Sequence, residues 1–181
     1  MAHKLTWGAI LALYVCFCTA QDMPKGMKTK AEPSATEASA VSEAFDKVKA
    51  LAGEWEAPYD GKIMKDSFRV VSGGSAVLHT ESWNGSTQGA VSLIYPNGNE
   101  LWFDHYCDLE NQPRFTAHPQ TNSDVVVFEL RDITNLRSPD AEYFRRGTFH
   151  FLDRNHHIQD WQLFKDGKQE EILRLDFKRT K

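Results

Sequence analysis

Turn signals recur about every ten residues from Trp55 to Lys178, and between them apolar residues alternate with a period of two. Asp60-Gly61 and Asp166-Gly167 are typical of two-residue hairpins, and Ser72-Gly73-Gly74 is a further turn signal. Connections this short cannot contain crossover helices, so successive strands must run antiparallel. The pattern predicts about ten strands, at residues 55–59, 62–71, 76–83, 90–95, 101–107, 114–118, 125–131, 143–152, 157–165 and 169–178.

A meander of this size hides its strand edges by closing, which predicts an all-β, up-and-down barrel of about ten strands. Alternation places Leu101, Phe103, His105 and Cys107 on one face of their strand. Polar residues therefore fall among apolar ones on faces that should be interior. A barrel of this strand number is wide enough to leave a cavity. The alternative is a two-sheet sandwich with a solid core.

The N-terminal part of the chain has a different composition. Residues 1–20 combine a short positive start, an apolar run and a small-residue cleavage site, which predicts a secretory signal peptide. Residues 21–41 are polar and predict a disordered spacer. A short amphipathic helix is expected from Ser42 to a stop at Gly53, so residues 42–181 form the barrel domain. The expected location is periplasmic or extracellular.

Charge and cysteine content narrow the class of partner. The whole chain has a net charge of −4, and loss of Lys4 with the signal peptide makes it slightly more acidic. An acidic domain argues against nucleic acid or anionic lipid as the main partner. Beyond residue 20 there is one cysteine, Cys107, so an internal disulfide is excluded. No apolar run after residue 20 is long enough for a membrane span.

Several short motifs resemble a known family. Gly53-Glu54-Trp55 resembles the Gly-x-Trp opening of lipocalin-like (calycin) barrels, in which the Trp plugs the closed end. Further motifs in the same order resemble secreted bacterial proteins that have a lipocalin-like barrel and no assigned function: Ser72-Gly-Gly-Ser75, His105-Tyr-Cys107, Asn111-Gln-Pro-Arg114, Asn135-Leu136-x-Ser138-Pro139, His157-x-x-x-Trp161 and Asp166-Gly-Lys168. The resemblance runs from about Phe45 to the C-terminus and implies a barrel with a pocket, but no particular activity.

The sequence also departs from that pattern. The family has histidines just after the Ser-Pro connection, where this chain has Tyr143-Phe144-Arg145. Nitrobindin-like barrels, which bind haem, are more distant relatives in shape. They have a second glycine after the first-strand Trp, and here Ala57 stands in its place. A ligand that those histidines hold in relatives is therefore expected to be lost or changed in this protein.

The stretch from Phe103 to Phe115 concentrates polar groups between apolar strand residues, as expected of a pocket. We expect barrel closure to bring His157 and Trp161 near it. Arg114 is the expected cation for a ligand carboxylate or phosphate, and an internal salt bridge to Asp104, Asp108 or Glu129 is its alternative role. The predicted ligand-binding residues are His105, Tyr106, Cys107, Asn111, Gln112, Arg114, His157 and Trp161.

The leading functional hypothesis is non-enzymatic binding of a small, partly apolar ligand inside the barrel. A hydrolase or isomerase that uses His105 with Tyr106 or Cys107 is one alternative, although neighbours on one strand lie too far apart for a direct hydrogen bond. A protein-binding module of the cell envelope is the other. No cofactor is predicted, because no histidines show zinc-site spacing, but a metal or haem site assembled across strands stays open. The oligomeric state is not predicted.

Overall fold

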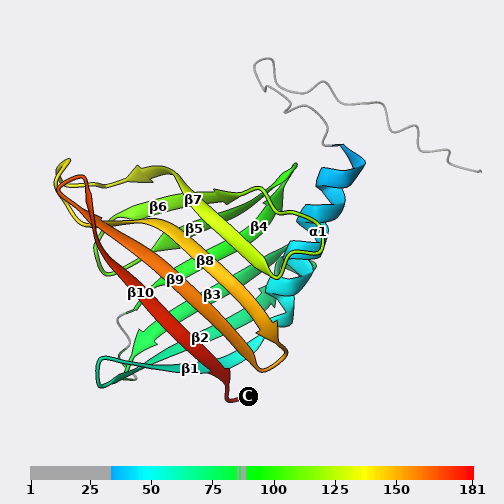
Figure 1. Cartoon of the computed structure of the whole chain (residues 1–181), viewed down its shortest axis with the longest axis horizontal. Coiled ribbons are helices and arrows are strands. Elements are labelled where there is room, and N and C mark those ends of the chain that lie inside the picture. Colours follow the sequence, from blue (N-terminus) through cyan, green and yellow to red (C-terminus); the bar gives the residue numbers. More distant parts are fainter. Residues whose placement is uncertain (1–33, 85, 87–88) are drawn as a thin grey trace, which may run out of the picture. The chain divides into compact units, whose positions relative to one another are not determined.

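The computed structural model describes residues 34–84, 86 and 89–181, which fold into one α-helix and ten β-strands (Figure 1). The helix is α1 (Ala35–Ala50), and a short 3-10 turn, η1 (Ser72–Gly74), separates the second and third strands. The strands are β1 (Gly53–Tyr59), β2 (Lys62–Val71), β3 (Ala76–Trp83), β4 (Val91–Asn97), β5 (Glu100–Tyr106), β6 (Gln112–Ala117), β7 (Val125–Thr134), β8 (Tyr143–Asp153), β9 (His156–Lys165) and β10 (Lys168–Arg179).

The strands form one closed antiparallel barrel in which each strand pairs with its neighbours in sequence. Pairing of Trp55 in β1 with Arg179 in β10 closes the sheet. Asp60-Gly61 has φ angles of 48° and 69°, and Asp166-Gly167 has 50° and 69°, as a two-residue hairpin with two left-handed positions requires. The predicted all-β barrel of ten strands is confirmed, and the sandwich alternative is wrong.

The helix begins earlier than the sequence pattern predicted. It starts at Ala35 rather than at Ser42, because Ser34 and Glu37 form a capping box: the Ser34 hydroxyl accepts from the Glu37 amide and the Glu37 carboxylate accepts from the Ser34 amide. Residues 35–41 of the predicted spacer are therefore helical, and Ala40 and Val41 are already buried. The predicted signal peptide and residues 21–33 lie outside the described residues. The helix α1 lacks the length and hydropathy needed to cross a bilayer.

The C-terminal half of α1 packs on one end of the barrel, which we call the helix end (Figure 1). The indole nitrogen of Trp55 donates to the carbonyl oxygen of Leu51 (2.7 Å). The guanidinium of Arg179 donates to the carbonyl oxygens of Ala50 and Ala52 at 2.8 and 2.6 Å and lies over the Trp55 ring. These bonds satisfy carbonyl groups that the end of a helix leaves without partners. They hold α1 against the start of β1 and the end of β10.

Aromatic side chains fill the interior from the helix end to the middle of the barrel. Phe103 is fully buried and has ring contacts with Phe115, Phe128, Phe149 and Trp161, with centroids 5.1–5.9 Å apart. These rings project inward because they alternate with polar residues along their strands. The opposite end, which we call the far end, contains the turns at Asp60-Gly61 and Asp166-Gly167.

Candidate ligand-binding pocket

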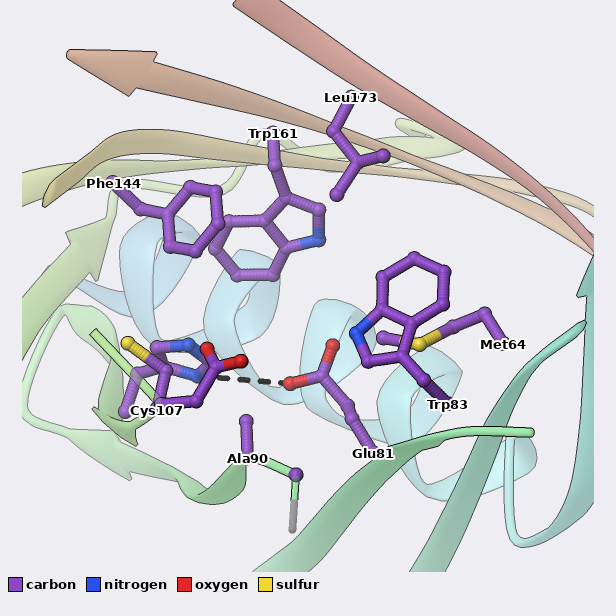
Figure 2. A pocket seen from close by; sticks show the side chains of 11 residues that line it. Met64, Glu81, Trp83, Ala90, Cys107, Phe144, Trp161 and Leu173 are labelled. Carbon is purple, nitrogen blue, oxygen red and sulfur yellow. Dashed lines mark ion pairs between the residues drawn. The ribbon is translucent and has the colours of Figure 1, made fainter. Parts of the chain in front are cut away.

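A pocket lies in the barrel interior near the far end (Figure 2). The cavity has a volume of about 60 Å³, which is enough space for several waters or a small ligand group. Its lining comes from six strands, β2, β3, β5, β8, β9 and β10, and from the segments before β4 and after β5. The lining residues are Met64, Glu81, Trp83, Gly89, Ala90, His105, Cys107, Asp108, Phe144, Trp161 and Leu173.

The walls of the pocket are largely apolar. Phe144 from β8, Trp161 from β9 and Leu173 from β10 face Trp83 and Met64 across the cavity (Figure 2). The Trp161 and Phe144 rings lie 5.5 Å apart. Apolar and aromatic walls with few polar groups are typical of small-molecule sites.

His105 is one of two buried polar residues in the pocket lining, and burial keeps its imidazole neutral. Its Nδ1 shares a 2.8 Å hydrogen bond with the hydroxyl of Ser92, its partner across the β4–β5 ladder, and its ring stacks on Trp161 at 5.5 Å. Burial, helped by the electrostatic effect of nearby His79, lowers the pKa of His105 to about 3. A neutral imidazole offers a ligand a hydrogen-bond donor or acceptor but no charge.

Glu81 is the other buried polar residue in the pocket lining, and its side chain is acidic. Burial raises its pKa to about 7; Asp66 and Asp108 add to this rise, while His79 opposes it. Its Oε2 lies 3.8 Å from His105 Nδ1, which is beyond hydrogen-bond distance, and His105 is neutral at pH 7. The contact drawn as a dashed line in Figure 2 is therefore weak. Neither lysine nor arginine is among the described lining residues, so the pocket is neutral to acidic.

Cys107 also faces the pocket, two residues after His105 (Figure 2). Burial raises the pKa of its thiol to about 11. The thiol is thus almost wholly protonated at neutral pH, whereas a nucleophilic cysteine needs the thiolate. The side chain is a small apolar part of the wall.

A buried polar network lies deeper in the barrel, and sequence reasoning missed its centre. Asp66 Oδ2 accepts hydrogen bonds from His79 Nε2 and Gln159 Nε2, both at 2.8 Å. The same Gln159 amide lies 3.2 Å from His157 Nε2, and its oxygen accepts from the Trp161 indole at 3.0 Å. The network links the back of the pocket to the helix end of the barrel.

One part of this network has the donor atoms of a metal site. Ligand atoms of Asp66, His79 and Glu81 all lie within 4.8 Å of one another, and all three residues are buried. The sequence signal was present in β3, where His79 and Glu81 alternate with half-buried positions as inward residues do. Histidine spacing along single strands does not reveal this group, because it is assembled across the β2–β3 ladder, as the cross-strand alternative in the sequence analysis allowed.

The structure brings three of the eight predicted site residues to the pocket: His105, Cys107 and Trp161. Three others project from the outer face of their strands. Tyr106 is 53% exposed, Gln112 accepts a hydrogen bond from the Thr134 hydroxyl (2.9 Å), and Arg114 pairs with Asp132 of β7. They lie outside because strand neighbours of the inward His105, Pro113 and Phe115 must face solvent. The partner of Arg114 is therefore neither a pocket ligand nor one of the three predicted carboxylates.

The remaining two residues are buried elsewhere. Asn111 donates from its amide to the carbonyl oxygen of Glu142 (2.8 Å) and joins the β5–β6 connection to the start of β8. His157 lies towards the helix end, stacked on Phe177 at 4.9 Å and edge-on to Trp55 at 4.4 Å. It reaches Trp161 only through Gln159.

The fold and the pocket define a class of protein: a closed ten-stranded antiparallel barrel with a small pocket beside a buried polar network. No family model matches the sequence, and no curated protein matches it. Among solved structures, Rv2717c from M. tuberculosis is similar, with 15% sequence identity and a TM-score of 0.53 over 76% of this chain and 98% of that one. At this identity the similarity establishes the fold alone, and it is consistent with a lipocalin-like barrel.

Proposed function

We propose that this protein is an exported, non-enzymatic barrel that binds a small, partly apolar molecule in the pocket near the far end. The observation that carries the proposal is the combination of facing aromatic walls, Trp83 and Trp161, with two buried polar groups, His105 and Glu81. Apolar walls supply burial, and a few convergent polar groups supply orientation. Export, periplasmic or extracellular, rests on the composition of residues 1–20 alone.

The charge of the pocket sets the ligand class. Arg114 points away from the pocket, and the lining contains Glu81 and Asp108 but neither lysine nor arginine. A ligand carboxylate or phosphate would lack a cationic partner there, and burying it unpaired is costly. The ligand we propose is neutral or positively charged, with an aromatic or aliphatic part that fits between the two indoles.

Geometry favours binding over the catalytic alternative. His105 and Tyr106 lie on opposite faces of β5, so they cannot act together on one substrate. His105 and Cys107 share the pocket, but burial raises the pKa of the thiol to about 11 and lowers the pKa of His105 to about 3. At pH 7 the thiol is therefore protonated, and an imidazole with so low a pKa is too weak a base to take its proton. Membership of the secreted lipocalin-like family is proposed on the motifs alone.

Native mass spectrometry of the protein purified from its own source tests the proposal. We expect an added mass that is lost on denaturation, and the released molecule should quench tryptophan fluorescence when it is returned to the apoprotein. Trp161→Phe should weaken its binding by about tenfold, because Trp161 forms the pocket wall. The matched control is Trp102→Phe, since Trp102 lies on the outer face against Arg131.

Arg114→Ala is a second control, and it should leave binding unchanged. A ligand whose affinity depends on Arg114 but not on Trp161 would refute the pocket assignment. Native protein with no added mass, together with no binding in a screen of small amines and neutral aromatic molecules, would refute the proposed function.

A further inference from the structure

Two carboxylates face each other inside the barrel. Asp66 in β2 and Glu81 in β3 are direct partners across the antiparallel ladder, and both side chains point inward. Their exposed fractions are 1% and 8%. Like charges directly opposite each other destabilise a sheet, and burial removes the water that would screen them. When both are ionised, the pair therefore requires a compensating positive charge.

His79 is the basic side chain beside this pair. It lies two residues before Glu81 on the same face of β3, and its Nε2 is 2.8 Å from Asp66 Oδ2. Lysine and arginine are absent from the buried side chains of the described part of the chain.

The hydrogen bonds of this group are incomplete. Asp66 Oδ1, His79 Nδ1 and Glu81 Oε2 are buried and have no hydrogen-bond partner. Buried polar atoms in proteins nearly always have partners, so three such atoms in one cluster are available to bind a ligand. His105 Nδ1 lies 3.8 Å from Glu81 Oε2, and it already shares a hydrogen bond with the Ser92 hydroxyl.

The donor atoms suit a divalent transition-metal ion. One imidazole and two carboxylates are common ligands of Zn²⁺, Mn²⁺ and Fe²⁺, with bonds of about 2.0–2.2 Å. The ligand atoms already lie within 4.8 Å of one another, a separation that side-chain rotation can close. The amide of Gln159 donates a hydrogen bond to Asp66 Oδ2. This bond helps to orient the carboxylate, as outer-shell hydrogen bonds do for metal ligands.

We propose that Asp66, His79 and Glu81 bind one divalent transition-metal ion, and we take Zn²⁺ as its probe. Three protein ligands leave at least one coordination position for water or another ligand. Glu81 also lines the pocket, so the ion would lie at the pocket's inner wall. This proposal does not rest on the proposed function, because metal binding can be measured without any organic ligand.

The test uses tag-free protein stripped with a chelator and then titrated with ZnCl₂ by calorimetry. Elemental analysis after gel filtration measures the bound metal. We expect one zinc ion per chain in the parent protein, and affinity about tenfold weaker or worse in Glu81→Gln and Asp66→Asn. The control is His150→Gln. His150 forms a similar pair with Asp160 (2.9 Å) on the outer face, so its loss should leave zinc binding unchanged.

X-ray absorption at the zinc edge identifies the atoms that surround zinc in the parent protein. It therefore tests the proposal even if a variant fails to fold. The parent complex should show oxygen and nitrogen neighbours with one imidazole, and a sulfur neighbour would instead place the ion at Cys107 and overturn the proposal. Absence of zinc binding by the parent protein would also overturn it. The same holds if folded Glu81→Gln and Asp66→Asn, checked by circular dichroism, bind zinc as tightly as the parent.

Discussion

Trp161 packs directly on Gly147, its partner across the β8–β9 ladder, where no side chain larger than hydrogen fits. A Cβ atom at position 147 would lie 2.7 Å from the indole Cζ3. The glycine therefore lets the indole lie flat against the backbone, and this position sets one wall of the pocket.

Gly147→Ala should destabilise the protein by about 1–3 kcal/mol, because either the Trp161 ring or strand β8 must move. Urea unfolding followed by circular dichroism measures the change. Combination with Trp161→Phe should cost less than the sum of the two single changes, since the smaller ring leaves room for the methyl group. Strict additivity would show that the two residues do not interact.

The Cys107 thiol should react slowly. Its pKa is raised to about 11, against about 8.5 for a free cysteine, so the thiolate fraction at pH 7.5 falls by about 100-fold or more. Ellman's reagent should therefore react far more slowly with the folded protein than with the protein in denaturant, and the rate should rise towards pH 11. Rapid reaction of the folded protein at pH 7.5 would contradict the raised pKa of this half-buried thiol.

Acid should weaken the fold through His157. Burial, with smaller contributions from His79, Arg179 and His156, lowers its pKa to about 3, whereas an unfolded histidine titrates near 6.5. Between these pH values only the unfolded state takes up the proton, so this contribution is complete above pH 6.5 and is lost as the pH falls. The loss is at most about 1.4 kcal/mol per pH unit.

Urea unfolding at pH 7.5, 6.0 and 5.0 measures that slope. His157→Phe should make the slope less steep, since a phenyl ring can stack on Phe177 but cannot take up a proton. The slope that remains should include the contribution of His105, whose pKa is also lowered to about 3. The comparison variant is His118→Gln, whose side chain is 67% exposed, and its slope should match that of the parent. An equally steep slope in His157→Phe would assign the acid sensitivity to other groups.

The first turn of α1 depends on its cap. Ser34→Ala removes the hydroxyl that accepts from the Glu37 amide, and N-cap substitutions of this kind cost about 1 kcal/mol. We expect a lower melting temperature and a smaller helical signal in circular dichroism. Ser42→Ala, an exposed change in the middle of the same helix, should be neutral or slightly stabilising. If both variants melt alike, the cap does not contribute to stability.

Local rules were enough to predict the barrel. Asp60-Gly61 and Asp166-Gly167 accept the left-handed backbone of a tight hairpin, and this chemistry depends only on neighbouring residues. The same rule that placed His105 inward should have placed Arg114 outward, because Phe115 beside it is plainly a core residue. The polar stretch from Phe103 to Phe115 was predicted to form one site, but its side chains alternate between the two faces of the barrel wall.

Other features depend on pairing that no short window of sequence contains. Asp66 lies opposite Glu81 because the turn at η1 fixes the register of β2 against β3. A shift of one residue in either strand would turn its carboxylate to solvent. The early start of α1 is a different case. The capping-box spacing of Ser34 and Glu37 was visible in the sequence, but the polar composition around it outweighed that signal in our interpretation.

The pairing of β1 with β10 has a consequence for how the protein acquires its shape. The first and last strands are far apart in sequence, and contacts of this kind form slowly because a long loop must close first. Until β10 is in place, β1 and β9 each present an unpaired edge that another chain or a protease can reach. The time between synthesis and closure is thus the most vulnerable period of this protein, and a cut within β10 would extend that vulnerability for the life of the molecule.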